Sequence, residues 1–460
     1  ELELPTSQFD VSAYVVETGA SLTIDVTYAT AIHDSAYIET LIENVIRHVK
    51  AICADPEQSP IAMAAPNELQ KRLWFVDQFE NGVLYPAAPT YYNMAAEYRC
   101  DPTLVATVIA KRFNTALASD TVLKRSFDMN ADMPKLQSCA IPVQFCQTLG
   151  ADDVDAFIAK PFDLSAPPLV RIAHVPDSGK LLIVAHHIIA DQHGLDRIAN
   201  AILTGDMPAV SSDTASATNP KDLAFWRANL GENPPRLLLP ADHPRAAVHV
   251  YRPVAADTLL DAVGVQALLA FASATGLSQD DIITGAFCAF LQRLSGQDTI
   301  VFGKTHARTA GSGPRENLVT LQVALKDGEP ASGALADIAQ VAKDAALHGQ
   351  TDFDVVVRDL KPDNDMSRTA LFDVLLVTDV TPHVDRSAPV ATGWGKYDLV
   401  LAVLPSSDGQ LQIRLTANAE MFDQATVDGW ARILRQILRA LPLHADTPIA
   451  TLPLLPPNEM

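Results

Sequence analysis

Two adjacent histidines follow an apolar run in the stretch LLIVAHHIIADQHG, residues 181–194. His186 and His187 end the run, and Asp191 comes four residues after His187. The run LLIVA predicts a strand that is buried on both faces, and a polar group at the end of such a strand must be hydrogen bonded or functional. Because imidazole both accepts and donates protons near neutral pH, acid–base chemistry is the first hypothesis for this stretch.

The two histidines are expected to have different roles, because consecutive strand residues point to opposite faces. One imidazole can face a cavity while the other is held by hydrogen bonds. Asp191 can turn back toward the base of the loop and fix it, through backbone N–H groups or through a cation. A metal site made of His186, His187, Asp191 and His193 is disfavoured because the adjacent histidines diverge. A structural role for both histidines is the simpler interpretation of the pair taken alone.

Composition narrows the classes of function. The chain has 460 residues, enough for two or three domains, and its net charge of −21 repels phosphate backbones and anionic membrane surfaces. We therefore expect no nucleic-acid or membrane partner. The opening residues lack a basic region followed by an apolar core, so no secretion signal is expected. The five cysteines are scattered without a CxxC pair, which is typical of reduced thiols in a cytoplasmic protein without structural zinc.

One sequence unit occurs twice, at residues 9–62 and 397–450. Each copy has an aromatic residue followed by Asp, two alternating runs around a turn, a run with helical spacing of apolar residues, and a closing PIA triplet. The pattern predicts a hairpin followed by a helix. Two copies so far apart suggest the end of one domain followed by a whole second domain. The first copy alone has too little core to be stable, so its apolar helix face is expected to dock on another surface.

Between the copies, predicted strands alternate with predicted helices, which is typical of α/β layers. Strands are expected at 180–188, 299–304 and 371–378, and the Pro-rich stretch 234–248 is the candidate boundary between two halves. Helices are expected at five further places: 102–118, 194–204, 263–275, 279–295 and 334–347.

The segment HHIIADQHG is similar to the HHxxxDG motif of condensation domains of nonribosomal peptide synthetases. Further stretches resemble motifs of that family in the same order, from about residue 64 to residue 460. They are ELQKRLWFVDQFENG (68–82), YYNM (91–94), LLLPADHPR (237–245), PRENLVTLQVAL (314–325) and the segment 348–377. The ending LPLLPPNEM resembles the linker into an adenylation domain, which argues against a stand-alone CoA-dependent acyltransferase.

The resemblance implies an α/β fold with two chloramphenicol-acetyltransferase-like lobes, arranged as a V-shaped pseudo-dimer around a tunnel. Residues 64–236 would form the N-terminal lobe, with the HHxxxD motif, and residues 237–456 the C-terminal lobe. Residues 1–62 would be a hairpin–helix remnant, the truncated tail of a second condensation-type domain.

The resemblance also implies roles for single residues. His187 would orient the acceptor amine and take its proton, His186 would be structural, and Asp191 would form an ion pair with Arg308. The candidates for lining the tunnel are Gln192, His193, Gly194, His306 and Gln322. The substrates would arrive on the 4′-phosphopantetheine arms of upstream and downstream peptidyl carrier proteins, next to an adenylation domain, and the domain itself would bind no cofactor and no metal.

The sequence also departs from the family pattern. Gln192 replaces a glycine, the stretch 119–127 keeps only part of a motif, an aromatic motif is missing before residue 222, and GKTHAR and Leu321-Gln322 differ from their motifs. Three functions therefore stay open. The first is amide formation between carrier-bound substrates. The second is a non-catalytic platform that recruits a tailoring enzyme, such as a hydroxylase or oxygenase, to a carrier-bound amino acid. The third is modification of a tethered residue.

Overall fold

The computed structural model divides the chain into two units, Glu1–Ala64 and Ala65–Met460. In the first unit it describes residues 11–18, 21–28, 38 and 42. In the second unit it describes residues 66–454 except 81–89, 91, 102, 121, 128–135, 139–143, 207–218, 232, 248–251, 308–315, 364, 366, 379–385, 392–396 and 406–408.

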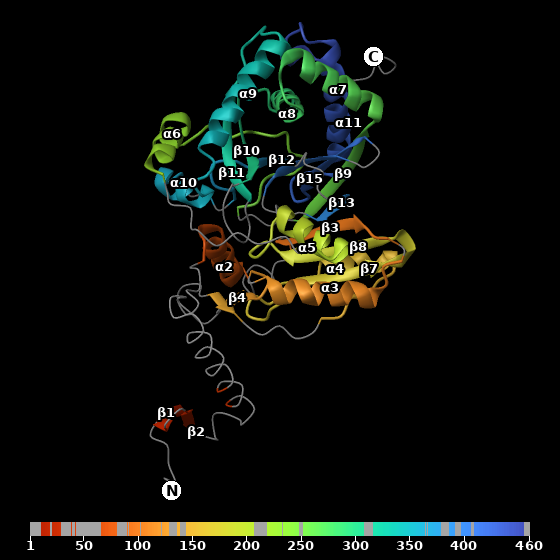
Figure 1. Cartoon of the computed structure of the whole chain (residues 1–460). Helices are drawn as coiled ribbons and strands as arrows, with labels where there is room; N and C mark the ends of the chain where they lie inside the picture. Colours follow the sequence, from red (N-terminus) through yellow and green to blue (C-terminus); the bar gives the residue numbers. More distant parts are fainter. Residues whose placement is uncertain are drawn as a thin grey trace. The chain divides into compact units, whose positions relative to one another are not determined.

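The first unit contains the predicted hairpin. Strands β1 (Val11–Thr18) and β2 (Ser21–Tyr28) pair antiparallel, with Thr18 opposite Ser21 at the turn end (Figure 1). Most of the helix that the sequence predicts after this hairpin lies outside the described residues. The second copy of the repeat has the same order, with strands β14 (Leu399–Pro405) and β15 (Leu411–Asn418) followed by helix α11 (Gln424–Ala440).

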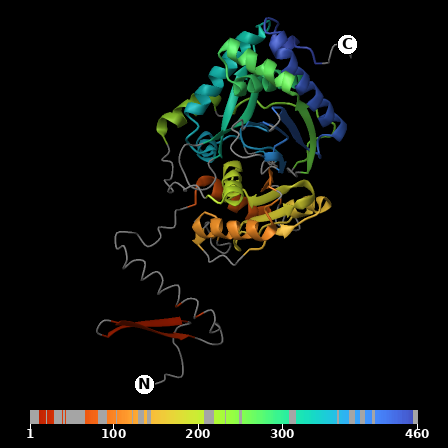
Figure 2. The same ribbon diagram turned by 45° about the vertical axis from the view of Figure 1, so that its right-hand side comes forward.

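A five-stranded sheet forms the lower layer of the second unit in Figure 2, in the order β13-β3-β8-β7-β6. Its strands are β3 (Asn93–Arg99), β6 (Gln147–Thr148), β7 (Val170–Val175), β8 (Lys180–His186) and β13 (Arg386–Ala391). All neighbours are antiparallel except β6 and β7. Although β13 comes from the second half of the chain, it pairs with β3 of the first half (Figure 1).

Helices cover both faces of this sheet because β8 is apolar on both. Leu181, Ile183 and Ala185 pack with helices α3 (Ala106–Ser119) and α5 (Gln192–Thr204), whereas Leu182 and Val184 pack with α4 (Val154–Ile158). The alternation follows the two-residue period of a strand. The predicted strand 180–188 ends two residues early, at His186, because the N–H groups of Ile189 and Ala190 turn back to the His186 carbonyl at 3.0 and 3.3 Å.

A six-stranded sheet forms the upper layer, in the order β11-β10-β12-β14-β15-β9. Its further strands are β9 (Pro253–Leu260), β10 (Thr299–Ala307), β11 (Glu316–Ala324) and β12 (Val374–Thr378). Strand β12 is parallel to both β10 and β14, and the other pairs are antiparallel. The largest hydrophobic core joins this sheet to helices α7 (Ala262–Thr275), α8 (Gln279–Ser295), α9 (Ala331–Leu347) and α11.

The remaining elements are short or lie around these layers. They are α2 (Glu68–Glu80), α6 (Pro220–Leu230), α10 (Phe353–Leu360), the pair β4 (Arg125–Phe127) and β5 (Leu136–Ser138), and the 3₁₀ turns Ala151–Asp153, Pro176–Ser178, Leu441–Leu443 and Ile449–Thr451. The predicted helices at 194–204, 263–275, 279–295 and 334–347 match α5, α7, α8 and α9 within a few residues, and the helix predicted at 102–118 begins later, at Ala106.

Candidate active site

Strand β8 places the two histidines at its end, with their backbones fixed to neighbouring segments. The N–H of His186 donates to the Leu169 carbonyl, and the N–H of His187 donates to the Tyr92 carbonyl, both at 2.9 Å. Both side chains are buried. These hydrogen bonds fix the backbone from which each imidazole extends.

The His186 ring is enclosed by protein. Its Nδ1 accepts a hydrogen bond from the backbone N–H of Ile188 at 3.2 Å, and its ring centroid lies 6.0 Å from that of Tyr92 and 6.3 Å from that of Phe162. Burial, together with the neighbouring His187, lowers the pKa of His186 from 6.5 to about 3. A neutral ring that accepts a backbone hydrogen bond fits the structural role expected for this residue.

The His187 ring is held in one tautomer. Its Nδ1 lies 3.2 Å from the carbonyl oxygen of Ala190. Because a carbonyl oxygen can only accept, Nδ1 carries the proton and the lone pair is on Nε2. Burial lowers the pKa of His187, and the positive charge of Arg72 acts in the same direction, although Asp191 and the Ala190 carbonyl oppose both. The neutral imidazole, which is the form able to accept a proton, is therefore favoured.

A cavity of about 260 Å³ lies against His187. Residues from both halves of the unit line it. The first half contributes His187, Arg72, Val76 and Tyr92. The second half contributes Phe353, Asp354, Val357, residues 368–370 and Tyr397. A group bound in this cavity would therefore contact both halves and the imidazole together.

Asp191 joins the histidine loop to the other half of the unit. It is fully buried and is the N-cap of α5, where its Oδ1 accepts from the Gly194 N–H at 2.8 Å. Its Oδ2 accepts from the N–H of Glu316, the first residue of β11, at 2.7 Å. The sequence predicted that Asp191 fixes the loop base through backbone N–H groups or a cation, and these contacts agree with the first option. The expected partner Arg308 lies outside the described residues, so that ion pair stays a prediction.

The side chain of Gln192 is directed to strand β3 and helix α5. Its amide nitrogen donates to Asp196 Oδ1 at 3.1 Å and to the Tyr98 hydroxyl at 3.3 Å. The described lining of the cavity includes neither Gln192 nor its neighbours His193 and Gly194. Gly194 instead donates its N–H to Asp191, and a Cβ at this position would lie 3.0 Å from the Ala190 Cβ.

The other two tunnel-lining candidates lie in the six-stranded sheet. His306 of β10 has its Nε2 3.1 Å from the Gln350 amide nitrogen, and its ring packs on Gly349. Gln322 of β11 is opposite Val301 of β10. Neither is among the described residues that line the cavity at His187, and their role in a tunnel stays a prediction.

Two rings that line the cavity, those of Phe353 and Tyr397, both pack on Phe372, which is not among the described lining residues. The rings of Phe372 and Tyr397 stack 5.4 Å apart, and Phe353 packs on Phe372 at 5.3 Å. Gly303 of β10 makes room for this stack, because a Cβ there would lie 2.1 Å from the Phe372 ring. This packing therefore depends on a position in β10 that only glycine fits without displacing the ring.

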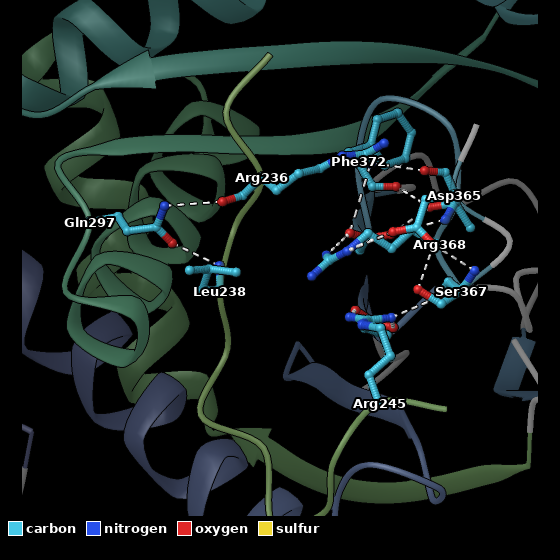
Figure 3. Close-up of polar contacts among 11 residues, drawn as sticks. Arg236, Leu238, Arg245, Gln297, Asp365, Ser367, Arg368 and Phe372 are labelled. Atoms are coloured by element: carbon cyan, nitrogen blue, oxygen red, sulfur yellow. Dashed lines mark hydrogen bonds and ion pairs between the residues drawn. The ribbon is translucent and has the colours of Figure 1, made fainter. Parts of the chain in front are cut away.

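The loop that carries residues 368–370 is held by arginines and aspartates. Arg236 donates to the Thr369 carbonyl at 2.8 Å, and Arg245 donates to the Ser367 carbonyl at 2.9 Å and to the buried carboxylate of Asp398 (Figure 3). Arg368 donates to Asp373 at 2.6 Å. Both Arg236 and Arg245 come from the Pro-rich connector.

The same loop delays the start of strand β12. The predicted strand 371–378 begins only at Val374, because Leu371 has a φ of 64° and Asp373 accepts from the Thr369 N–H at 3.0 Å. Residues 368–370, which line the cavity, therefore lie in a loop before β12, and arginines of the Pro-rich connector hold this loop.

Arg72, Tyr92 and Arg368 were not predicted as site residues, although each lies within a stretch that resembles a family motif. Tyr397, which was not predicted either, begins the second copy of the repeated unit. Arg72 lies in ELQKRLWFVDQFENG and Tyr92 in YYNM, so the motifs themselves were the signal. No group of three or more His, Cys, Asp or Glu side chains suited to a metal ion occurs in the part of the chain that the structure describes. Among the same residues, no helix has the length and apolar character needed to cross a bilayer.

Comparison with known proteins identifies the family. The family model of the condensation domain matches residues 209–460. The chain therefore belongs to the condensation-domain family of nonribosomal peptide synthetases, as the motifs predicted.

Curated relatives include one component of the plipastatin synthase of Bacillus subtilis (strain 168), which is 28% identical over 408 residues, covering 80% of this chain and 11% of that protein. The malpibaldin synthetase of Mortierella alpina is 25% identical over 452 residues, covering 87% of this chain and 8% of that protein. The chain thus spans only a small part of the length of these relatives.

Two solved structures show the fold. A four-domain nonribosomal peptide synthetase bound to AMP and glycine matches with a TM-score of 0.72 and 17% identity, over 86% of this chain and 34% of that one. The X-domain from teicoplanin biosynthesis matches with a TM-score of 0.66 and 18% identity, over 84% of this chain and 96% of that one. The predicted α/β fold with two chloramphenicol-acetyltransferase-like lobes is therefore confirmed.

Proposed function

We propose that this condensation domain forms an amide bond between a donor thioester and an acceptor amine, both carried by peptidyl carrier proteins. The observation that carries the proposal is the placement of His187. Its imidazole is buried, has its lone pair on Nε2, and lines a cavity to which both halves of the unit contribute. A neutral imidazole in such a place can accept a proton from a substrate bound between the halves.

The proposed reaction keeps its atoms and protons balanced. The acceptor amine attacks the donor thioester carbon, and His187 Nε2 takes the proton that the amine loses. The C–S bond breaks, the amide carbonyl re-forms, and the departing sulfur takes the proton from the imidazolium to leave a thiol. Holding two tethered reactants together can supply about 7–11 kcal/mol of the barrier reduction in favourable cases. The domain then needs no cofactor of its own, because each phosphopantetheine arm belongs to a carrier protein.

The substitution of glycine by Gln192 does not argue against this chemistry. A glutamine that filled the cavity would favour a non-catalytic platform. The Gln192 amide instead bonds to Tyr98 and Asp196, and the cavity beside His187 remains. The geometry of this substitution thus supports catalysis over closure.

The proposal extends to the partners and the domain limits. We propose upstream and downstream carrier proteins and a neighbouring adenylation domain, because the relatives are much longer than this chain. We also propose lobes at 64–236 and 237–456, and a remnant of a second condensation-type domain at 1–62. The hairpin formed by β1 and β2 supports the last proposal, since it has the order of the hairpin formed by β14 and β15.

A reconstituted module with loaded donor and acceptor carrier proteins tests the function. We expect the wild-type chain to form the dipeptidyl thioester, as detected by intact-protein mass spectrometry, and His187→Ala to lower the rate by about 10²–10⁴-fold. The control is His174→Ala on β7, which should keep the wild-type rate. A His187→Ala variant as fast as the wild type would contradict the proposal that this site forms the amide bond. A mass change on the donor carrier without any acceptor would point to modification instead.

A further inference from the structure

Among the described residues, Arg72 and Arg368 are the arginines that line the cavity, and they differ in how fully their charge is matched. Arg368 lies between two carboxylates, with Nη1 2.6 Å from Asp373 Oδ2 and Nε 3.7 Å from Asp365 Oδ2. Arg72 pairs with one carboxylate, with Nη1 2.9 Å from Asp354 Oδ1. The guanidinium of Arg72 therefore keeps N–H groups that this single contact does not use.

The setting of Arg72 directs those donors to the cavity. Arg72 and Val76 are four residues apart on α2, so they lie on the same face of that helix, and both line the cavity. Asp354 is in the first turn of α10, in the other half of the unit, and it holds the guanidinium by direct contact. The Arg72 side chain keeps 37% of its exposure, so its outer N–H groups can meet a ligand.

One donor of Arg72 has no partner in the part of the chain that the structure describes. Among the described residues, its Nε is a buried atom without a hydrogen bond. A buried donor left unpaired costs about 1–3 kcal/mol, and such groups deserve a functional explanation. The one contact to Asp354 thus anchors Arg72 without satisfying its guanidinium.

We propose that Arg72 is a second substrate-contacting group of this site, whose guanidinium donates hydrogen bonds to the carbonyl oxygen of the donor thioester as that oxygen becomes negative. This inference rests on the proposed amide-forming function. It names the group that stabilises the oxyanion, while His187 handles the proton.

The movement of electrons gives Arg72 a role separate from that of His187. When the amine attacks, the carbonyl π electrons move to oxygen and create an oxyanion. When the C–S bond breaks, the same electrons return and the amide carbonyl forms. Arg72 stays protonated throughout, because a guanidinium does not lose its proton in proteins. A preorganised donor in a protein cavity acts more strongly than one in water.

The kinetic test compares Arg72→Gln with a matched control. Arg227→Gln removes another arginine that pairs with α10, since Arg227 of α6 is ion-paired with Asp359. We expect Arg72→Gln to lower kcat by about 10²–10³-fold with little change in KM, and Arg227→Gln to keep the wild-type kcat. The acid limb of the pH–rate profile should also move to higher pH in Arg72→Gln, because removing a positive charge near His187 raises its pKa. A wild-type kcat in Arg72→Gln would overturn the proposal.

A binding test separates this proposal from the proposed function. A pantetheine-linked phosphonamidate, which carries an anionic oxygen where the oxyanion would form, is titrated by calorimetry. We expect its Kd to rise about 100-fold in Arg72→Gln, while the Kd of the neutral amide product rises much less. Equal effects on both ligands would overturn the role of Arg72.

This binding measurement does not need turnover. It therefore still tests the role of Arg72 if His187→Ala keeps the wild-type rate and so contradicts the proposed amide-forming function. If circular dichroism shows that Arg72→Gln does not fold, Arg72→Lys replaces it. This variant keeps the charge and loses the planar donor fork, and a wild-type phosphonamidate affinity would then contradict the proposal.

Discussion

The two halves of the second unit hold their sides of the cavity by different means. In the first half, His186 and His187 are fixed by hydrogen bonds with backbone groups of Ile188 and Ala190. In the second half, the loop that carries residues 368–370 is fixed by ion pairs such as Arg245 with Asp398 and Arg368 with Asp373. The histidine segment is thus held by neutral hydrogen bonds, and the loop of the second half is held by ion pairs.

The difference follows from what each side must do. A carboxylate bonded directly to His187 Nδ1 would raise the pKa of the ring, so a smaller fraction of it would be neutral and free to accept a proton near neutral pH. A carbonyl group orients the ring with a weaker effect of this kind. The loop of the second half need only be rigid, and buried ion pairs fix geometry well although they add little net stability. The following variants test this contrast.

The largest expected effect is a loss of stability in acid that arises from the neutral histidine side. The pKa of His186 is about 3 in the folded chain, whereas the ordinary pKa of a histidine is 6.5. Between these values the unfolded chain binds more protons, so the free energy of unfolding falls as pH falls from 6.5 toward 3, by at most about 5 kcal/mol from this residue. Above pH 6.5 His186 is neutral in both the folded and the unfolded chain, so it no longer makes the free energy of unfolding depend on pH.

Urea unfolding at several pH values measures this slope. His186→Asn keeps an acceptor for the Ile188 N–H and removes the titrating group, so its free energy of unfolding should fall less steeply over the same range. Identical slopes in the two proteins would show that His186 is not held neutral.

The next effect comes from the charged side. Arg245→Met removes the partner of Asp398, whose carboxylate is buried. Breaking a buried pair from one side costs about 3–5 kcal/mol, so the free energy of unfolding at pH 7 should fall by about that amount. Arg252→Met is the control, because its pair with Glu420 is exposed and should contribute less than about 1 kcal/mol. Equal losses of free energy of unfolding in the two variants would contradict the claim that the buried pair contributes more than the exposed one.

Asp191→Asn tests the link between the halves. The carboxylate accepts from the N–H groups of Gly194 and Glu316, whereas an amide has only one accepting oxygen. Losing one charge-assisted hydrogen bond should lower the free energy of unfolding by about 2 kcal/mol, as measured by urea titration. We expect Asp206→Asn, a change at the exposed end of α5, to have almost no effect. If Asp191→Asn left the free energy of unfolding unchanged, this residue would not hold the halves together.

Gly303→Ala tests the packing on Phe372. The added Cβ would lie 2.1 Å from the Phe372 ring, and overpacking of this kind costs about 1–3 kcal/mol. Because the lining rings of Phe353 and Tyr397 pack on Phe372, displacing it should also shift this part of the cavity and slow amide formation. Gly429→Ala is the control, because its Cβ would meet nothing within 4 Å inside helix α11, and it should stabilise the chain by about 0.5–1 kcal/mol. A destabilising Gly429→Ala beside a neutral Gly303→Ala would contradict the packing argument.

The smallest expected effect belongs to Gln192→Gly, which restores the residue of the family motif. Because the Gln192 amide is directed to Tyr98 and Asp196, the cavity should not change, and the condensation rate should stay close to that of the wild type. A rate increase of about 10-fold or more, a barrier change of about 1.4 kcal/mol, would show that Gln192 obstructs the site.

The elements around the site were predictable where their pattern is local. The apolar run before His186 predicted β8. His186 and His187 do have different contacts, but β8 ends at His186, so strand alternation does not account for the setting of His187. The strand boundary was less accurate, because the turn at 189–190 depends on hydrogen bonds that alternation does not encode.

The long-range features could not be predicted from spacing. The segment 386–391 has no strand-like alternation, yet β13 pairs with β3 almost 300 residues earlier. Arg72 and Asp354 meet only because α2 and α10 come from opposite halves of the unit. The two repeated hairpins show the same limit, since their pattern is shared but only β14 and β15 are seen within a six-stranded sheet.

The most direct test of the account is the pH dependence of single-turnover amide formation between loaded carrier proteins. We predict a rate that is constant near neutral pH and falls on the acid side with an apparent pKa below 6.5, since burial lowers the pKa of His187, and this acid limb should be absent in His187→Ala. A wild-type profile with an apparent pKa above 6.5, or the same limb in the variant, would contradict the claim that a neutral His187 accepts the proton.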